Sequence, residues 1–364
     1  MLATAAALLF ASACGDDDDS STTSPAPTTM DAAAEGPADT TPATTQVDQE
    51  VSDDDMSDDT SPPAATVEAG ATRIADTVYG PVEVPVDAER VFALDEYAGA
   101  VMLSVGIEPV AAFQPYDAVV STQLLDEAGV ELVPATFGEW NYEAIAAYEP
   151  DLIVLTDTQD PAVTEQLSDI APAVTLPFVA PWRDGFTALG SAAGQEERTD
   201  AAVAELEQRL ASVAAQADGA VMSVLGTGPV FGTYTIGSDT PTAQIIAEAG
   251  YARPDTQAEP ANLGALFSLS PEVLGDHDGD IVVAYGGNPG FYDADALAAL
   301  PTYAALPAAQ DGRTVEVLGE VWINSDPFSM FWVIEDLAAI ADGGQPATLD
   351  DVGERWVAFL ELGQ

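Results

Sequence analysis

The chain contains no lysine, a single histidine and a single cysteine. Its basic residues are eight arginines, set against 62 Asp and Glu among 364 residues. Proteins that bind nucleic-acid phosphates or anionic lipid headgroups need a basic face, so the composition excludes both classes. One cysteine permits no internal disulfide. The composition instead predicts a solvated acidic surface, suited to a salty medium that screens its self-repulsion.

Metal-ligand sets and catalytic motifs are also missing. A bare zinc or manganese site needs several His or Cys ligands. His277, the only histidine, stands between two aspartates, and we interpret it as a solvated turn residue. No G-x-S-x-G or phosphate-loop motif occurs, and the glycines at 226, 228 and 232 do not match a dinucleotide fingerprint. We therefore expect a protein that is not an enzyme and has no cofactor.

An apolar stretch opens the chain and closes on small residues before Cys14. This is the shape of a secretory signal over residues 1–14. The sole cysteine after it resembles the lipobox of bacterial lipoproteins, although Ala11 stands where that pattern usually has Leu. The resemblance implies that Cys14 is lipidated and tethers the protein to the outer face of the cytoplasmic membrane. No later segment has 18 consecutive apolar residues.

Residues 15–72 consist mainly of Asp, Ser, Thr, Pro and Ala and contain no aromatic side chain. Such a stretch cannot bury enough surface to offset the entropy lost on ordering. The segment predicts a disordered acidic tether.

From Arg73 onward, short apolar runs alternate with helical stretches. This pattern predicts parallel sheets covered by helices, in two lobes at 73–195 and 218–364. The expected strands are 91–95, 110–113, 152–156, 173–176, 221–225, 280–285 and 314–318. The expected helices are 97–105, 120–129, 141–148, 241–250, 270–276 and 327–341.

Residues 196–217 contain no Gly or Pro, and their apolar residues are spaced three and four apart. This predicts a single interlobe helix of roughly 33 Å at 1.5 Å per residue. A rigid rod of this kind limits how far the two lobes can close.

Each lobe repeats one local pattern. Asn141 is followed two residues later by Glu143, and Ser270 is followed two residues later by Glu272; eight residues after each Glu, an Asp precedes a buried strand. Asn and Ser are good N-caps, and a carboxylate in the first turn complements the helix dipole. Taken alone, each Glu could be only a helix-start residue.

The order of motifs from residue 79 onward resembles the periplasmic binding proteins of iron-siderophore and vitamin B12 importers. The resemblance rests on segments 80–95, 105–113, 141–155, 269–283 and 306–317. It implies two Rossmann-like lobes, one long bridging helix and a ligand held between the lobes. It also implies that Glu143 and Glu272 dock on arginines of an ABC permease dimer that works with ATPase subunits. We expect the binding protein to be a monomer.

Ligand in such folds is met by loops at the carboxyl ends of strands. Aromatic faces there can pack on a chelate, while Arg, Tyr and Asn reach its oxygens. Each such residue could equally be core or interlobe packing. The candidates are Tyr97, Tyr116, Trp140, Trp182, Arg183, Tyr234, Trp322 and Asn324.

Charge narrows the ligand class. Fifteen of the 62 acids precede Arg73, which leaves 47 acids against eight arginines, a net charge of about −39. A trianionic ferric catecholate would be repelled by this field, whereas a neutral or cationic ferric hydroxamate would not. Cobalamin and haem binders of the same fold remain alternatives, as does a surface sensory or adhesion module.

Overall fold

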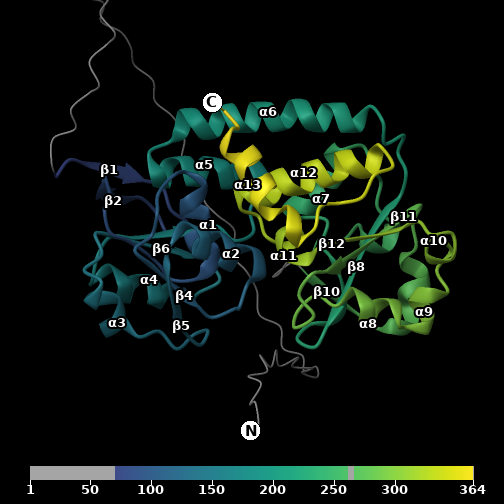
Figure 1. Ribbon diagram of the computed structural model, residues 1–364, viewed down its shortest axis with the longest axis horizontal. Coiled ribbons are helices and arrows are strands. Elements are labelled where there is room, and N and C mark those ends of the chain that lie inside the picture. The colour runs from purple at the N-terminus through teal and green to yellow at the C-terminus, as the bar shows by residue number, and fades with distance from the viewer. Residues whose placement is uncertain (1–69, 261–265, 364) are drawn as a thin grey trace, which may run out of the picture. The chain divides into compact units, whose positions relative to one another are not determined.

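The computed structural model describes residues 70–260 and 266–363, which form two α/β lobes (Figure 1). A short antiparallel hairpin, β1 (Thr72–Ala75) and β2 (Val82–Pro85), precedes the first lobe. The predicted signal segment and Cys14 lie outside the described residues.

The first lobe is built on a five-stranded sheet in the order β5-β4-β3-β6-β7, with all strands parallel. Parallel neighbours need crossovers, and here these are helices of six to ten residues. The strands are β3 (Val91–Ala93), β4 (Ala111–Gln114), β5 (Glu131–Pro134), β6 (Leu152–Thr156) and β7 (Ala173–Leu176). The helices are α1 (Glu96–Ser104), α2 (Val119–Ala128), α3 (Tyr142–Ala147) and α4 (Pro161–Ser168).

The second lobe differs from the purely parallel sheet that the sequence predicts. Its order is β10-β9-β8-β11-β12, and the pairs β8–β9 and β9–β10 are antiparallel. Only three residues separate β8 from β9, and so short a connection can form only a hairpin. The strands are β8 (Met222–Gly228), β9 (Gly232–Ile236), β10 (Leu266–Leu269), β11 (Ile281–Gly286) and β12 (Thr314–Leu318).

Short helices flank this second sheet. They are α7 (Pro241–Glu248), η1 (Asp255–Gln257), η2 (Pro271–His277), α8 (Ala294–Ala298), α9 (Pro301–Ala304), α10 (Pro307–Gln310) and α11 (Gly319–Ile323). The helix expected at 270–276 is η2, a 3₁₀ helix. His277 at its end is buried, and Thr256 and Gln257 lie within 3.3 and 3.4 Å of its Nδ1. The interpretation of His277 as a solvated turn residue was therefore wrong.

The predicted interlobe helix is confirmed as α6 (Glu196–Ala214), which is 19 residues long and ends three residues earlier than expected. It does not bridge the lobes alone. Helices α5 (Trp182–Ala193), α12 (Pro327–Ala341), α7 and α13 (Val352–Leu360) lie beneath it in Figure 1. Helix α12 is apolar nearly all round, so it is buried on all sides.

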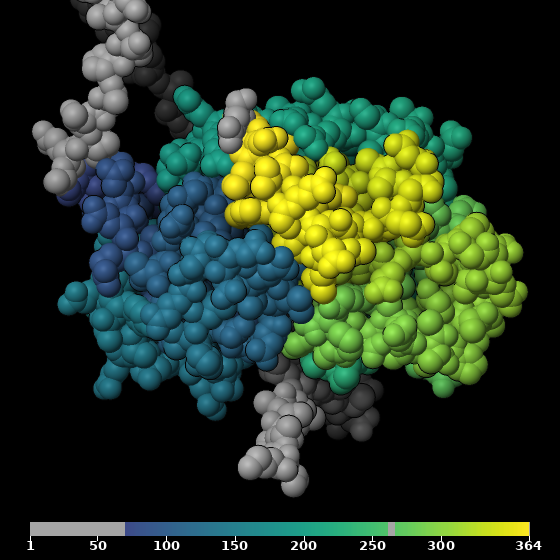
Figure 2. Space-filling view, viewed as in Figure 1, coloured from purple at the N-terminus to yellow at the C-terminus, as the bar shows by residue number. Residues whose placement is uncertain are grey.

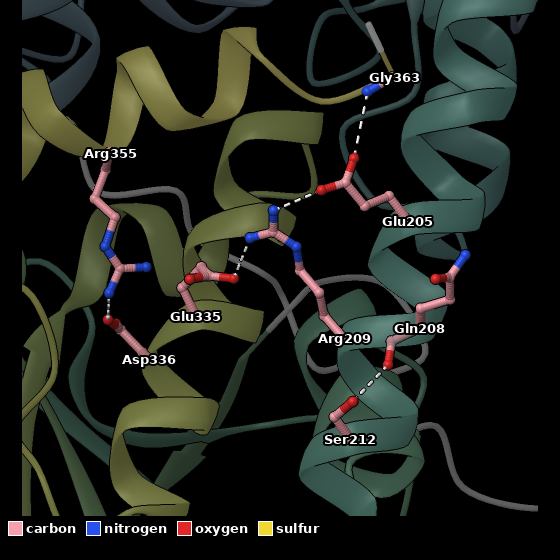
Figure 3. Close-up of polar contacts among 8 residues, drawn as sticks. All are labelled: Glu205, Gln208, Arg209, Ser212, Glu335, Asp336, Arg355 and Gly363. Atoms are coloured by element: carbon pink, nitrogen blue, oxygen red, sulfur yellow. Dashed lines mark hydrogen bonds and ion pairs between the residues drawn. The ribbon is translucent and has the colours of Figure 1, made fainter.

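One continuous hydrophobic core runs through this helical layer into both lobes. It includes Val154 of the first sheet, Leu206 of α6, Leu337 of α12 and Val283 of the second sheet. Arg209 of α6 also pairs with Glu205 on its own helix and with Glu335 on α12, as Figure 3 shows. The two lobes thus share packing as well as a connecting rod.

Candidate ligand-binding site

Five aromatic side chains gather at the carboxyl ends of the first sheet, and we call them the first aromatic cluster. They are Tyr97, Tyr116, Phe137, Trp140 and Phe178. Tyr97 starts α1 after β3, Tyr116 follows β4, and Phe178 follows β7. Ring centroids lie 5.3 Å apart for Tyr97–Tyr116, 5.4 Å for Tyr116–Phe137 and 6.0 Å for Phe137–Trp140. These are ordinary contact distances for tilted and edge-on rings.

A second aromatic cluster forms at the corresponding ends of the second sheet. It consists of Phe231, Tyr234, Tyr285, Phe291 and Tyr292. Phe231 sits in the β8–β9 turn, 5.9 Å from Tyr234 and 6.2 Å from Phe291, and Tyr292 lies 6.3 Å from Tyr285. These contacts join the β8–β9 turn to the loop after β11.

Gly226 of β8 lies against the Tyr234 ring of this cluster. A Cβ at this position would meet the Tyr234 ring well inside van der Waals contact. Gly226 therefore makes room for the ring.

The two clusters meet at the junction of the lobes. Burial raises the pKa of Tyr97 well above its usual value, and the charge of Glu320 and the neighbouring Tyr292, both from the second lobe, raise it further. A cavity of about 30 Å³ lies at this junction, lined in part by Tyr97, Phe178 and Asn324. Figure 2 shows the lobes in direct contact below the C-terminal segment.

Two buried acids lie under the first cluster. The side chain of Asp95 caps α1 through Ala98 N at 2.7 Å, and burial raises its pKa to about 6. Glu96 accepts hydrogen bonds from the amides of Tyr116 and Ala118 at 3.0 and 3.3 Å. Burial raises the pKa of Glu96 to about 7, because desolvation outweighs these hydrogen bonds. The site is therefore acidic as well as aromatic.

Four buried polar atoms in or beside the two clusters have no hydrogen-bond partner among the described residues. They are Trp140 Nε1, Tyr234 OH, Asn324 Oδ1 and Glu96 Oε2. Buried polar groups in folded proteins are nearly always paired. Such unpaired atoms mark a place where a ligand or ordered water completes the hydrogen bonding. Three of the four belong to residues that the sequence singles out as ligand candidates.

The structure gives Trp182 and Arg183 packing roles. Trp182 is fully buried at the start of α5, and its Nε1 lies 3.4 Å from Glu248 of α7. Arg183 stacks 4.2 Å above that ring and pairs with Glu207 at 2.7 Å and with Glu248 at 2.9 Å. These contacts fasten α5 to α6 and α7.

Trp322 is likewise fully buried, and its Nε1 donates to Asp336 of α12 at 2.9 Å. Asp336 also receives Arg355 at 3.2 Å, a pair drawn in Figure 3. Trp322 thus anchors α11 to the helical layer. Of the eight candidates, Tyr97, Tyr116, Trp140, Tyr234 and Asn324 are the ones that lie in the clusters or line the junction cavity.

Sequence reasoning missed Phe137, Phe178, Phe231, Phe291 and Tyr292. Phe178 and Tyr292 follow strands β7 and β11, so the strand-end rule could have found them. Phe231 lies in a hairpin turn whose flanking strand β9 the sequence did not predict.

Glu143 and Glu272 are both exposed, in the first turns of α3 and η2. Asn141 caps α3 through Ala144 N at 3.0 Å. Ser270 does not cap η2; instead its hydroxyl donates to the Glu272 carboxylate. Neither glutamate forms an ion pair within residues 70–260 and 266–363.

Residues 70–260 and 266–363 contain neither a metal-binding cluster nor a membrane-spanning helix. No group of three or more His, Cys, Asp or Glu side chains there is placed to hold a metal ion. In the same residues, no helix combines the length and the apolar character needed to cross a membrane.

Two α/β lobes that share a helical layer, each with an aromatic cluster at its strand ends, define a two-lobed binding protein. The family model for periplasmic binding proteins matches residues 103–318, so the chain belongs to this family.

Two relatives and one solved structure illustrate the similarity. The chain is 28% identical over 221 residues to the ferric enterobactin-binding periplasmic protein FepB of Escherichia coli, covering 56% of this chain and 67% of FepB. It is 26% identical over 283 residues to the probable siderophore-binding lipoprotein YfiY of Bacillus subtilis, covering 74% and 77%. The structure of Staphylococcus aureus SirA complexed with staphyloferrin B matches with a TM-score of 0.62 at 21% identity, covering 76% and all of the two chains.

Proposed function

We propose that the protein is the binding component of an ABC importer and delivers a ferric siderophore to the permease. The observation that carries the proposal is the pair of aromatic clusters, one from each lobe, around buried polar atoms without partners. FepB and YfiY are named for siderophores, which supports this ligand class. The importer's chemistry lies in its ATPase subunits, so the binding protein itself needs no catalytic group or cofactor.

The positions of the arginines favour a chelate without negative charge. All eight lie in the described residues, and the cation–π contacts among these residues are on Trp182, Phe331 and Trp332, outside both clusters. Arg253 acts on one cluster residue, because its charge opposes the effect of burial, which raises the pKa of Tyr285. The charged groups that influence Tyr97 and Tyr116 are the acids Asp95, Glu96 and Glu320. An acidic aromatic site repels a trianionic catecholate and accepts a neutral or cationic hydroxamate. We infer that the ligand is a ferric hydroxamate.

Glu143 and Glu272 are the proposed permease-docking residues. Helix α3 and helix α9, against which η2 packs, both lie on the side away from α6 in Figure 1. Two exposed acids on that side suit a partner that presents two arginines. Exposed pairs are individually weak, so their main effect is to set orientation.

The proposal extends to the rest of the chain. Residues 1–14 would act as the signal and 15–72 as the tether, with Cys14 as the lipidated residue that holds the protein at the outer face of the cytoplasmic membrane. The folded part would divide into lobes at 73–195 and 218–364 around the helix at 196–217, and would act as a monomer.

Titration of the purified full chain, followed by Trp fluorescence, tests the ligand class. We expect ferrichrome, an uncharged ferric hydroxamate, to bind at least about tenfold more tightly than ferric enterobactin, a trianionic catecholate. Tyr116→Ala should weaken ferrichrome binding by about tenfold or more. Tyr79→Ala is the matched control, because Tyr79 is 45% exposed in the β1–β2 turn.

Tighter binding of ferric enterobactin would contradict the hydroxamate preference. Binding of haem or cobalamin in place of both chelates would establish the alternative cargo of the same fold. If no chelate binds at all, a sensory or adhesion role replaces transport.

A further inference from the structure

Helix α2 begins without a cap from its own sequence. Its N-cap residue, Ala118, has no side-chain acceptor, and the backbone there is extended at φ −60° and ψ 129°. The first amides of a helix have no partner within the helix and need one from elsewhere. At α2, that partner comes from the other lobe.

Glu320 of α11 supplies the missing acceptors. Its Oε2 accepts from the amides of Val119 and Val120 at 2.6 and 3.0 Å. Its Oε1 accepts from the amide and the hydroxyl of Ser121 at 3.0 and 3.1 Å. About 200 residues separate donor and acceptor in sequence, and Glu320 is only 3% exposed.

We propose that Glu320 is a latch that holds the two lobes in one relative position, because it supplies from the second lobe the cap that α2 of the first lobe lacks. A carboxylate at a helix N-terminus gains from both the charge-assisted hydrogen bonds and the helix dipole. Separating the lobes at this seam breaks all four contacts together. It also leaves a carboxylate and three amides to be solvated, so the seam opens as a unit.

The surroundings of the latch agree with this role. Helices α11 and α2 are in contact, and the nearby cavity lined by Tyr97, Phe178 and Asn324 holds only about 30 Å³, so the lobes are closely packed beside this seam. Ser325, next to α11, donates its hydroxyl to the Phe178 carbonyl of the first lobe and adds a weaker tie. The titratable groups near Glu320 are Glu96, Tyr97 and Tyr292. Glu96 accepts a hydrogen bond from the amide of Ala118, so two acids lie at the start of α2.

Hydrogen exchange at the α2 amides measures their hydrogen bonds to Glu320 directly and needs no ligand. In the full chain, the amides of Val119, Val120 and Ser121 should be protected, unlike the amides of Glu196 and Glu197 at the start of α6, whose N-cap Gln195 makes no side-chain cap. Glu320→Gln should lower the protection of these three amides by about tenfold or more, because hydrogen bonds to a charged acceptor are lost. Glu316→Gln, an exposed acid on the neighbouring β12, is the matched control and should leave them unchanged.

A second variant removes one contact from the other lobe. Proline is tolerated at the first position of a helix, and the backbone of Ala118 already suits a following proline. Val119→Pro therefore deletes one latch donor while preserving α2. Hydrogen-exchange protection at Val120 and Ser121 should fall. The double variant, Val119→Pro with Glu320→Gln, should lose no more protection than Glu320→Gln alone.

Lobe separation is measured between spin labels at Glu165→Cys on α4 and Asp295→Cys on α8, in a Cys14→Ser background. Both positions are exposed. Glu320→Gln should shift the distance distribution to longer values, and Val119→Pro should shift it less. Unchanged distances in both variants, or α2 amides that stay protected in Glu320→Gln, would overturn the latch.

Discussion

Replacing Glu96 by Gln should make the protein's stability less dependent on pH. Glu96 is fully buried, and one of its carboxylate oxygens has no partner. The amides of Tyr116 and Ala118 contact the other oxygen, which a Gln side chain can still provide. The substitution therefore removes the charge and keeps most of the geometry.

The magnitude follows from the pKa of Glu96, which burial raises from 4.5 to about 7. Because the folded-state pKa lies above the unfolded one, the folded protein binds a proton more tightly. Its contribution to stability is full below about pH 4.5 and is lost as the pH rises through about 7. Each pKa unit is worth about 1.4 kcal/mol, so the wild type should lose up to about 3 kcal/mol across this window.

Urea unfolding at pH 4.5 and pH 8 measures the effect. The free energy of unfolding of Glu96→Gln should change less between these pH values than that of the wild type, by about 2–3 kcal/mol. The Gln amide nitrogen takes the unpartnered position and costs about 1 kcal/mol at either pH, so the comparison is between slopes. Glu108→Gln, an exposed acid in the same lobe, should behave as the wild type. Parallel pH profiles for Glu96→Gln and the wild type would refute the reasoning.

Two further predictions concern docking and packing. Reversing both charges, Glu143→Lys with Glu272→Lys, should lower stimulation of the importer's ATPase by about tenfold while the chelate affinity stays unchanged; Glu165→Lys, on exposed α4, is the control, and normal stimulation by the double variant would contradict the docking role. Gly226→Ala should destabilise the fold by about 1–3 kcal/mol, because its methyl group collides with the Tyr234 ring. Gly275→Ala has no atom within 4 Å of the added Cβ and should change the unfolding free energy by less than about 0.5 kcal/mol. Equal unfolding free energies for the two glycine variants would contradict this prediction and show that the Tyr234 ring moves aside for the methyl group.

The sequence predicted the regular elements best where one physical signal dominated. Strands β6, β7 and β12 have the predicted bounds because the residues beside them mark their ends: Asp151 and Asp157 for β6, Pro172 and Pro177 for β7, and Arg313 and Gly319 for β12. Helix α12 also matches over 327–341, since Asp326 and Pro327 mark its start. These elements place the site, because they fix where each strand ends.

Local signals failed where a long-range contact decides the structure. Helix α5 was not predicted, because Gly185 and Gly190 lower helix propensity. Gly190 is in fact required, since a Cβ there would collide with Thr199 of α6. The latch was also missed: Glu320 reads as an ordinary acid in its segment, and its partners lie about 200 residues away.

Position after a strand did not separate ligand candidates from core residues. Tyr116 and Trp322 both follow predicted strands, but Tyr116 keeps a partly exposed ring among other aromatics, whereas Trp322 is fully buried against Asp336. What separates them is the packing of α12 on α11, which depends on residues from distant parts of the chain. Sequence patterns find such positions and leave their burial undetermined.

The junction of the lobes holds two buried acids, Glu96 with its unpaired oxygen and Glu320 at the start of α2. Burial of the charged form of Glu96 destabilises the folded chain, whereas four hydrogen bonds compensate the burial of Glu320. Natural proteins keep such buried acids mainly at functional sites. The buried acids also explain why the same junction would admit an uncharged or cationic chelate and reject an anionic one. Stability and selectivity should therefore respond together when Glu96 is neutralised: the pH dependence should flatten, and the discrimination against ferric enterobactin should narrow.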